Sequence, residues 1–445
     1  MQAGMFQSGQ IHKRHEPLDV LRGIAALGIL LINIRFMGAA STQALPAGGF
    51  RWLDTDWLIW MGAVIGLEGA MRGLFTLLFG AGIILAIQKT GALDQVLGRA
   101  FGLLLLGAAN AILLLWPGDV LFLYGLCVPA LLLVRAWPMG RLLILTAALM
   151  AGAIALQGMH AQNLRSELAL GLEAEISADS GQALTAAQWH SLAVREKALR
   201  KAGAASEAAQ AEEEKARRGD YLQVAAWSAA QWQRATLLPF LAGDGLETLA
   251  MMLLGMVLVR QWLASQEAMA GSSGLGAWKL ALLGYAFGLP AKAWVLAMAI
   301  QGDAGAIWLS ALLEHAGRAG MSIGHAGMIM AMIGAGRSDG QIRRALACVG
   351  RLALSNYLLA SLLAGLWFWG LGQWGRADWA GLWLVALAIW GVQLRFSLVW
   401  EARFGLGPAE RLFRAFSQVS NPPMPKGQAL GQRLIGGEQR RANGA

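Results

Sequence analysis

Long apolar runs separated by short polar segments dominate this sequence. A helix needs about 20 apolar residues to cross the roughly 30 Å hydrocarbon core of a bilayer. Runs of this kind lie near residues 18–38, 58–88, 98–116, 120–135, 141–158, 237–259, 279–300, 305–335, 351–371 and 379–398. The pattern predicts an all-α protein, a polytopic integral membrane helical bundle with about ten transmembrane helices.

The second and eighth runs, 58–88 and 305–335, are too long for one simple crossing. Both contain glycines and ionisable residues. Breaks in membrane helices are tolerated where other protein groups or a polar cavity satisfy the freed backbone. We therefore expect each run to be broken, strongly tilted or partly re-entrant.

Composition supports a membrane protein. Of the 445 residues, 56% are hydrophobic and 14% are charged, with a net charge of +9. Soluble proteins carry about 25% charged residues, so a soluble multidomain protein is excluded, and the apolar excess excludes a disordered one. Lys and Arg flank the apolar runs rather than forming one patch, which predicts no nucleic-acid partner. Cys127 and Cys348 form no CxxC or ligand cluster, so neither a disulfide nor a metal site is expected.

The distribution of positive charge predicts the orientation. If Lys13 and Arg14 lie in the cytoplasm, the following alternate loops and the tail hold most of the remaining basic residues. The prediction is therefore a bacterial cytoplasmic (inner) membrane protein with both termini in the cytoplasm. The first run contains Asp19, Arg22 and Asn33, which favours a retained span over a cleaved signal peptide.

Residues 160–235 differ from the rest of the chain. Their stretch REKALRKAGAASEAAQAEEEKARRGD is typical of exposed helix with short-range charge pairs. The predicted organisation is an N-terminal transmembrane bundle at 1–159 and an extracytoplasmic helical insertion at 160–235. A C-terminal bundle follows at 236–417, and a basic cytoplasmic tail at 418–445. The insertion is interpreted either as a spacer or as a segment that binds a partner.

Ionisable residues inside the predicted spans carry most of the functional information. A charge at the centre of a membrane helix costs about 2.5–3.5 kcal/mol on insertion scales, so such residues are usually paired or functional. Asp19 and Arg22 share one helix face, and so do Glu68 and Arg72. Each pair is either a structural ion pair or part of a site. A helix break beside Glu68 would also expose backbone donors that hold an anion.

Two further segments contain candidate residues. In the hairpin LLLLGAANAILLLWPGDVLFLYGL, Asn110 lies in the first arm and Asp119 in the turn, where it caps the returning helix or binds a ligand. The segment LLEHAGRAGMSIGHAGMIM contains Glu314, His315, Arg318 and His325. Histidine is the usual general base near neutral pH, and its alternative role here is a hydrogen bond between helices.

In their order along the chain, these segments resemble the YeiB-like family, known as domain of unknown function 418. The similar segments span residues 14–417 and are LDVLRGIAALGILLINI, LFTLLFGAG, the hairpin, LETLAMMLLGMVLVR, GRLALSNYLLAS (350–361) and GPAERLFR (407–414). The resemblance implies a transmembrane acyltransferase superfamily, whose members deliver an acyl group from cytosolic acyl-CoA to a glycan or related acceptor. It implies acyl-CoA as donor substrate and no tightly bound cofactor.

Two positions depart from the family pattern. The family commonly has His where this chain has Asn110, and commonly Tyr where it has His325. We therefore expect His325 as general base and Asp19 as the group that orients this base or Arg22. Asn33, Asn110 or Asn356 is expected to hold the developing oxyanion. Arg22, Arg351 and Arg414 would attract the donor's phosphates. The full set of expected binding residues is Arg22, Asn33, Glu68, Arg72, Asp119, Arg351, Asn356, Tyr357, Glu410 and Arg414.

Two other functional classes fit the same residues. A transporter or lipid-handling protein would use the same polar residues to line a path, with the broken helices that transporters employ. A non-catalytic relative would explain Asn110 and would use the insertion to bind a partner. The expected partners are the lipid bilayer, acyl-CoA and a glycan or lipid acceptor.

Overall fold

The computed structural model describes residues 16–40, 46, 51, 53–90, 93–199, 205–268, 273–301, 307–336 and 340–419. All regular structure in these residues is helical, which confirms the predicted all-α membrane bundle. Eight of the helical segments described are long and apolar enough to cross a membrane. Lys13, Arg14 and nearly all of the predicted tail lie outside the described residues, so the position of the termini stays a prediction.

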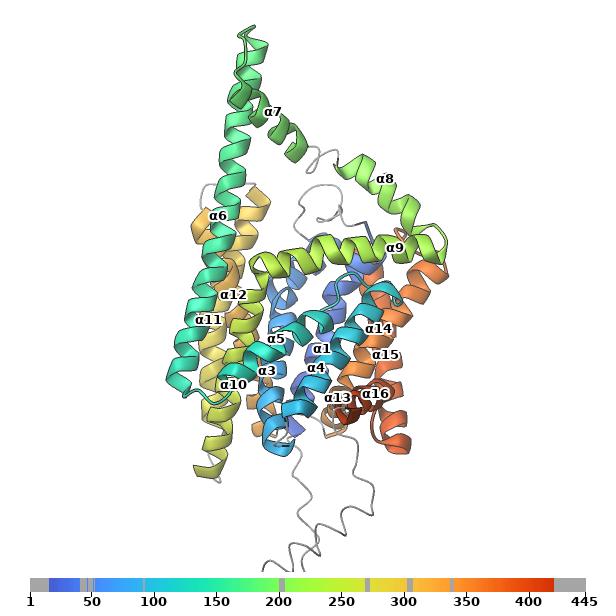
Figure 1. Ribbon diagram of the computed structural model, residues 1–445. Coiled ribbons are helices and arrows are strands. Elements are labelled where there is room, and N and C mark those ends of the chain that lie inside the picture. The colour runs from blue at the N-terminus through green and yellow to red at the C-terminus, as the bar shows by residue number, and fades with distance from the viewer. Residues whose placement is uncertain are drawn as a thin grey trace, which may run out of the picture.

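The N-terminal half supplies the centre of the bundle (Figure 1). Its helices are α1 (Glu16–Gly38), α2 (Thr55–Gly62), the π-helix η1 (Ala63–Leu67), α3 (Ala70–Thr90), α4 (Leu93–Ile112) and α5 (Leu121–Val134). Buried Leu, Ile and Val side chains from α1, α3, α4 and α5 join residues of α10 in one apolar core. The break predicted in the second run is confirmed, because Glu68 is extended and Gly69 has a φ of 71°. Glycine adopts this backbone conformation without steric cost.

The insertion is a continuation of the bundle. Helix α6 (Met139–Asp179) has 41 residues and runs without interruption through residue 160, projecting beyond the bundle (Figure 1). It is followed by α7 (Ala186–Leu199), α8 (Ala205–Arg217) and α9 (Tyr221–Gln231). Helix α9 lies across one end of the bundle, roughly perpendicular to the spanning helices (Figure 1). The chain returns to the bundle through the π-helices η3 (Trp232–Leu237) and η4 (Phe240–Asp244).

The C-terminal half completes the bundle. Its elements are α10 (Gly245–Ala268), α11 (Ser273–Gln301), α12 (Ile307–Gly334), α13 (Gly340–Arg351), α14 (Ala353–Gly365), the π-helix η5 (Leu366–Gly370), α15 (Trp379–Phe404) and α16 (Pro408–Val419). The eighth run is one continuous helix, α12, rather than a broken one. The ninth is interrupted at Leu352, between α13 and α14. Helix α16 lies across the end of the bundle opposite to α9 (Figure 1).

Two of the ten predicted spans are absent from the eight segments. Helix α5 has 14 residues, and at 1.5 Å per residue it is about 21 Å long, shorter than the hydrocarbon core. Helix α12 is long enough, but its glycines, two histidines, Glu314 and Arg318 reduce its apolar character. Both helices nevertheless lie among the spanning helices of the bundle (Figure 1).

Glycines allow the closest helix contacts. A Cβ atom on Gly350 of α13 would overlap the Asp19 carbonyl oxygen of α1, and one on Gly23 would overlap the Leu346 carbonyl oxygen. Gly80 of α3 and Gly255 of α10 meet the facing backbones in the same way. Small residues at such contacts let membrane helices pack through their backbones.

Candidate functional site

A buried network surrounds Asp119 in the connection between α4 and α5. The Asn110 Nδ2 atom donates a hydrogen bond of 2.9 Å to Asp119 Oδ1, and the Phe122 backbone N–H donates one of 2.9 Å to Oδ2. The Tyr357 hydroxyl, from α14, donates to Oδ1 at 3.4 Å and accepts from the Val120 N–H at 3.3 Å. The structure therefore brings three expected site residues together, and Asp119 also caps the start of α5.

The environment of Asp119 perturbs its protonation. Asp119 and Asn110 are fully buried, and Tyr357 is nearly so. Burial raises the pKa of Asp119 to about 6, against the opposing effect of the hydrogen bonds from Phe122, Asn110 and Tyr357. The Asn110 Oδ1 atom has no hydrogen-bond partner among the described residues. A carboxyl group with such a pKa can both accept and release a proton near neutral pH.

Asp19 belongs to a second network, at the start of α1. Its Oδ1 lies 3.1 Å from Arg22 Nη1, and its Oδ2 lies 3.9 Å from Arg351 Nη1. Arg351 also donates from Nε and Nη2 to both carboxylate oxygens of Glu401, the latter at 2.7 Å. Two arginines thus face two carboxylates. Glu401 was not predicted, because it lies beyond the predicted apolar run 379–398, near the end of α15.

The family-like segments 350–361 and 407–414 contact each other. Glu410 accepts hydrogen bonds from the Leu354 and Ser355 backbone N–H groups at 2.8 and 3.1 Å, and so caps α14. The Asn356 Nδ2 atom donates to the Val349 and Leu352 carbonyls and to Ser397 Oγ. These contacts hold the α13–α14 break together. Arg414 lies on the exposed side of α16, within electrostatic reach of Arg99.

A third network joins α10 and α12 inside the bundle. Glu247 lies 3.2 Å from both His315 Nδ1 and Arg318 Nε. Arg318 also lies 3.4 Å from Glu314, which accepts a hydrogen bond of 2.8 Å from Gln157. His315 Nε2 is buried without a partner among the described residues. The expected His–Arg segment is therefore an ion-pair network, which satisfies charges that membrane burial would otherwise penalise.

Sequence reasoning missed Glu247 and Lys292 of this third network. Lys292 is 5% exposed on α11 and lies within electrostatic reach of Glu68, Arg318, Glu314 and Glu247. Both residues are charges within apolar runs, so the criterion that found Glu68 would have found them. Glu68 and Arg72 are themselves exposed at the break before α3.

The expected general base lies apart from the other expected catalytic residues. His325 Nδ1 is 2.6 Å from the Met321 carbonyl of its own helix, and its ring packs edge-on against Tyr285. Asn33 is half-buried on α1. Asp19, Asn110 and His325 therefore belong to three different sets of contacts.

A small cavity of about 30 Å³, with room for about two water molecules, lies at the end of the bundle that α9 covers. Its aromatic wall consists of Trp116, Phe368, Trp369 and Trp374. Arg217 of α8 and Ser361 of α14 provide its polar groups. Trp116 lines this cavity, and its indole N–H lies near the Tyr357 hydroxyl of the Asp119 network, so the ring contacts both.

The model of the family described as "Protein of unknown function (DUF418)" matches residues 260–420. The matched segment runs from the last turns of α10 to the end of α16, and includes Arg351, Asn356 and Glu410.

Relatives extend the similarity beyond residues 260–420. The chain is 29% identical over 422 residues to the protein of Escherichia coli (strain K12) described as uncharacterized protein YeiB, covering 93% of this chain and 99% of that protein. It is 34% identical over 87 residues to uncharacterized protein YxaH of Bacillus subtilis (strain 168), covering 19% of this chain and 22% of that protein. No solved structure matches the chain. The chain is thus a polytopic membrane protein homologous to YeiB over nearly its full length.

Proposed function

We propose that this protein is a membrane-bound acyltransferase that transfers an acyl group from cytosolic acyl-CoA to a hydroxyl group of a cell-envelope acceptor. The observation that supports the proposal best is the buried Asp119 network, in which Asn110 and Tyr357 hold a carboxyl group whose pKa is about 6. The resemblance to transmembrane acyltransferases agrees with this chemistry, as an analogy at the level of the fold.

The proposed step needs one base and one group that stabilises negative charge. The base removes the proton of the acceptor hydroxyl, the resulting oxygen attacks the thioester carbonyl, and the carbon–sulfur bond breaks as the CoA thiol leaves. Asp119 is our candidate base, because its pKa of about 6 lies near the working range. Asn110 uses one amide N–H to hold Asp119 and has a second N–H for the developing oxyanion.

This assignment replaces His325 as the expected base. Its Nδ1 atom faces the Met321 carbonyl, and the backbone of Gly66 also hydrogen-bonds to the ring. These hydrogen bonds to the backbone favour a structural role for His325, in which it holds α12 against the break that follows η1. Rotation of the Trp116 side chain would connect the cavity with the Tyr357–Asp119 pair. The donor's phosphates are assigned to the opposite end, near Arg22, Arg351 and Arg414.

The test is acyl transfer by the purified protein in liposomes. Labelled acetyl-CoA is supplied on one side with extracted envelope lipids and glycans as acceptors, and the labelled product is counted. We expect transfer by the wild type and loss of at least a hundredfold in Asp119→Asn, as is typical when a general base is removed. The matched control is Asp378→Asn, because Asp378 caps α15 from an exposed position.

Three outcomes would contradict the proposal. Transfer that survives Asp119→Asn refutes Asp119 as the base. Absence of transfer by folded wild-type protein to every acceptor refutes the acyltransferase class. Activity that appears only in Asn110→His would identify the natural chain as a non-catalytic relative.

A second candidate function, ion or proton transport, rests on the Glu247–His315–Arg318 network. This network lies beside two interruptions of helix, at Gly69 before α3 and at Gly243 before α10. Membrane-embedded charges next to broken helices are features of transporters and proton relays. Proteoliposomes loaded with a pH-sensitive dye test it, because a Glu247→Gln change should abolish any proton flux that the wild type shows.

A further inference from the structure

A second pocket lies where the end of α3, the last turns of α10 and the connection from α5 to α6 meet. It has a volume of about 290 Å³ and is lined by Ile84, Ile87, Gln88, Arg135, Ala136 and Arg260. This volume is close to the lower end of the usual range for small-molecule sites, about 300–1,000 Å³. Two of the six lining residues are arginines and none is acidic. The pocket therefore has room for a small ligand, and its wall is positively charged.

The two positive charges are not neutralised by the protein. Arg135 Nη1 donates a hydrogen bond of 2.7 Å to the Leu132 carbonyl of its own helix. Arg260 Nη1 donates one of 2.8 Å to the Trp137 carbonyl, and its Nη2 donates to the Arg135 carbonyl. These acceptors are uncharged, and neither arginine forms an ion pair with a carboxylate in the described part of the chain. The carbonyl groups thus hold both guanidinium groups at one pocket, where the two like charges repel each other.

The donors that remain are suited to a phosphate group. Arginine has five N–H donors in a planar arrangement that matches the oxygen atoms of a phosphate. Among the described residues, the Arg135 side chain donates only from Nη1, which leaves its Nε and Nη2 atoms for a ligand. An anion bound between Arg135 and Arg260 would also reduce the repulsion between them. The charged part of the ligand is therefore a phosphate.

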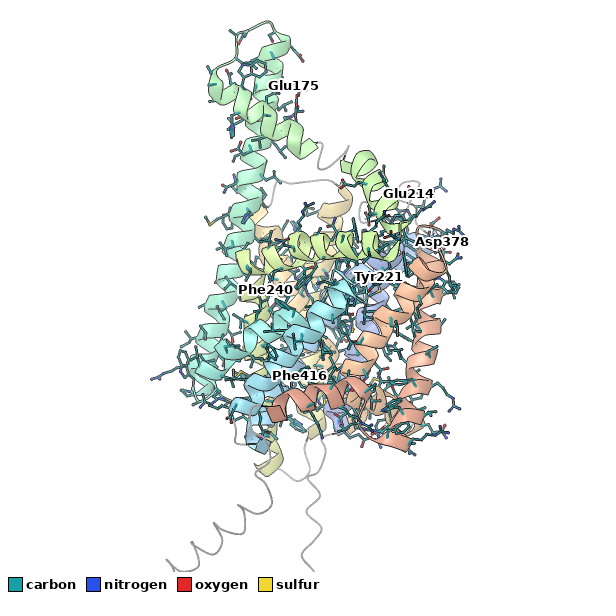
Figure 2. All side chains as sticks on the ribbon, turned by 45° about the vertical axis from the view of Figure 1, so that its right-hand side comes forward. Glu175, Glu214, Tyr221, Phe240, Asp378 and Phe416 are labelled. Atoms are coloured by element: carbon teal, nitrogen blue, oxygen red, sulfur yellow. The ribbon has the colours of Figure 1, made fainter. Side chains whose placement is uncertain are left out.

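The position of the pocket indicates that the phosphate belongs to a lipid. The connection from α5 to α6 and the last turns of α10 lie at the end of the bundle opposite to α9 (Figure 1). Figure 2 labels Phe416 at this end and Tyr221 at the other. Trp137, in the same connection, is 39% exposed, and tryptophan is enriched where membrane proteins cross the bilayer surface. Basic pockets between membrane helices at this level bind the headgroups of anionic lipids.

The apolar part of the wall separates a lipid from a free phosphate compound. Ile84, Ile87 and Ala136 line the pocket beside the arginines, and a water-soluble phosphate would leave them without apolar contacts. A phospholipid places its phosphate on the arginines and the first carbons of its acyl chains on the isoleucines. A zwitterionic lipid fits less well, because its ammonium group would lie near two arginines with no acidic lining residue to receive it.

We propose that this pocket binds one anionic phospholipid, with its phosphate held by Arg135 and Arg260 and its acyl chains packed against Ile84 and Ile87. The inference goes beyond acyl transfer and does not depend on it. The basic residues of this end predict that it faces the cytoplasm, so the lipid belongs to the cytoplasmic leaflet. A lipid bound there contacts α3, α5 and α10 together and stabilises the folded bundle.

The experiment is native mass spectrometry of the full-length protein in detergent, titrated with dioleoyl-phosphatidylglycerol, dioleoyl-phosphatidylcholine or free coenzyme A. The measured quantity is the dissociation constant of the first bound ligand. We expect phosphatidylglycerol to bind at least tenfold more tightly than phosphatidylcholine. Arg135→Gln should weaken the binding of phosphatidylglycerol about tenfold, because it removes one of the two charges that hold the phosphate.

Two further variants distinguish a pocket from general attraction to a basic surface. Arg141→Gln is the matched control, because Arg141 is exposed at the start of α6 and does not line the pocket, yet its replacement removes the same charge. It should change the binding less than twofold. Ile87→Trp keeps both arginines and fills the pocket, so it should also weaken the binding about tenfold. Circular dichroism shows whether each variant is folded.

Each result decides the inference. Selective binding of phosphatidylglycerol that is weakened by Arg135→Gln and Ile87→Trp, and kept by Arg141→Gln, supports it. Equal binding of the two lipids overturns it, and so does equal loss in Arg135→Gln and Arg141→Gln, because the attraction would then come from the surface as a whole. Unchanged binding in Ile87→Trp overturns the location. Binding of coenzyme A without binding of phosphatidylglycerol overturns the lipid and identifies a site for a soluble phosphate compound. If Arg135→Gln does not fold, Ile87→Trp against Arg141→Gln gives the decision.

Discussion

Replacing Asp119 with Asn should stabilise the protein at neutral pH and leave its stability nearly unchanged near pH 4. Burial raises the pKa of this carboxyl from 3.8 to about 6, and one pKa unit corresponds to about 1.4 kcal/mol. A raised pKa means that the folded state binds the proton more tightly than the unfolded state. The stability that this proton provides is complete below pH 3.8, and is lost as the pH rises through about 6.

The magnitude follows from this difference. Ionised Asp119 costs the folded protein about 3 kcal/mol at neutral pH. Asn is isosteric and stays neutral, but it has one acceptor oxygen in place of two, so one hydrogen bond from Asn110 or Phe122 is weakened at about 1 kcal/mol. The net gain should therefore be about 2 kcal/mol at neutral pH and close to zero near pH 4.

Reversible unfolding in mixed detergent, followed by circular dichroism from about pH 4 to pH 8, measures the effect. The difference between variant and wild type should appear between pH 4 and pH 6, and Asp378→Asn should show no such pH-dependent gain. A variant that is destabilised at neutral pH, or by the same amount at every pH, would refute the argument. A residue that lowers stability in its ionised form is expected where function requires that form.

Three further predictions concern the other contacts. Glu247→Gln should cost about 3 kcal/mol in the same assay, because it leaves buried His315 and largely buried Arg318 with less compensating charge. Glu214→Gln in the exposed pair with Arg218 should cost less than about 1 kcal/mol, and equal costs would contradict the burial argument. Gly350→Ala should cost about 1–3 kcal/mol, because its Cβ would overlap the Asp19 carbonyl. Gly391→Ala should be tolerated, because its Cβ would meet open space. A neutral Gly350→Ala would show that α1 and α13 move apart freely. Glu410→Ala should cost about 1–2 kcal/mol. It should also increase hydrogen exchange at the Leu354 and Ser355 amides, because their N–H groups lose their acceptor. Unchanged exchange at these two amides would refute the capping role.

The site was only partly predictable. Asn110, Asp119 and Tyr357 were expected site residues, yet their convergence required α14 to pack against the α4–α5 hairpin, 237 residues from Val120 along the chain. Asp19 pairs with Arg22, as their shared helix face indicated, and also lies near Arg351, whereas His325 belongs to another set of contacts. Helical periodicity identifies residues that share one helix face, but it does not specify which helices become neighbours.

Apolar length and composition were enough to predict the class of the protein and the existence of its spans. Apolar length sets helix formation in a bilayer, because every backbone group must be satisfied within the helix. The break beside Glu68 was also local, since Gly69 permits its left-handed backbone. Only the tertiary structure decided that the insertion folds back over the bundle and closes a cavity. The polar side chains of α9 that achieve this, such as Tyr221 and Ser228, bond to carbonyl groups more than 100 residues away in the chain. Such contacts depend on where the ends of other helices lie in space, and the sequence of α9 does not indicate those positions.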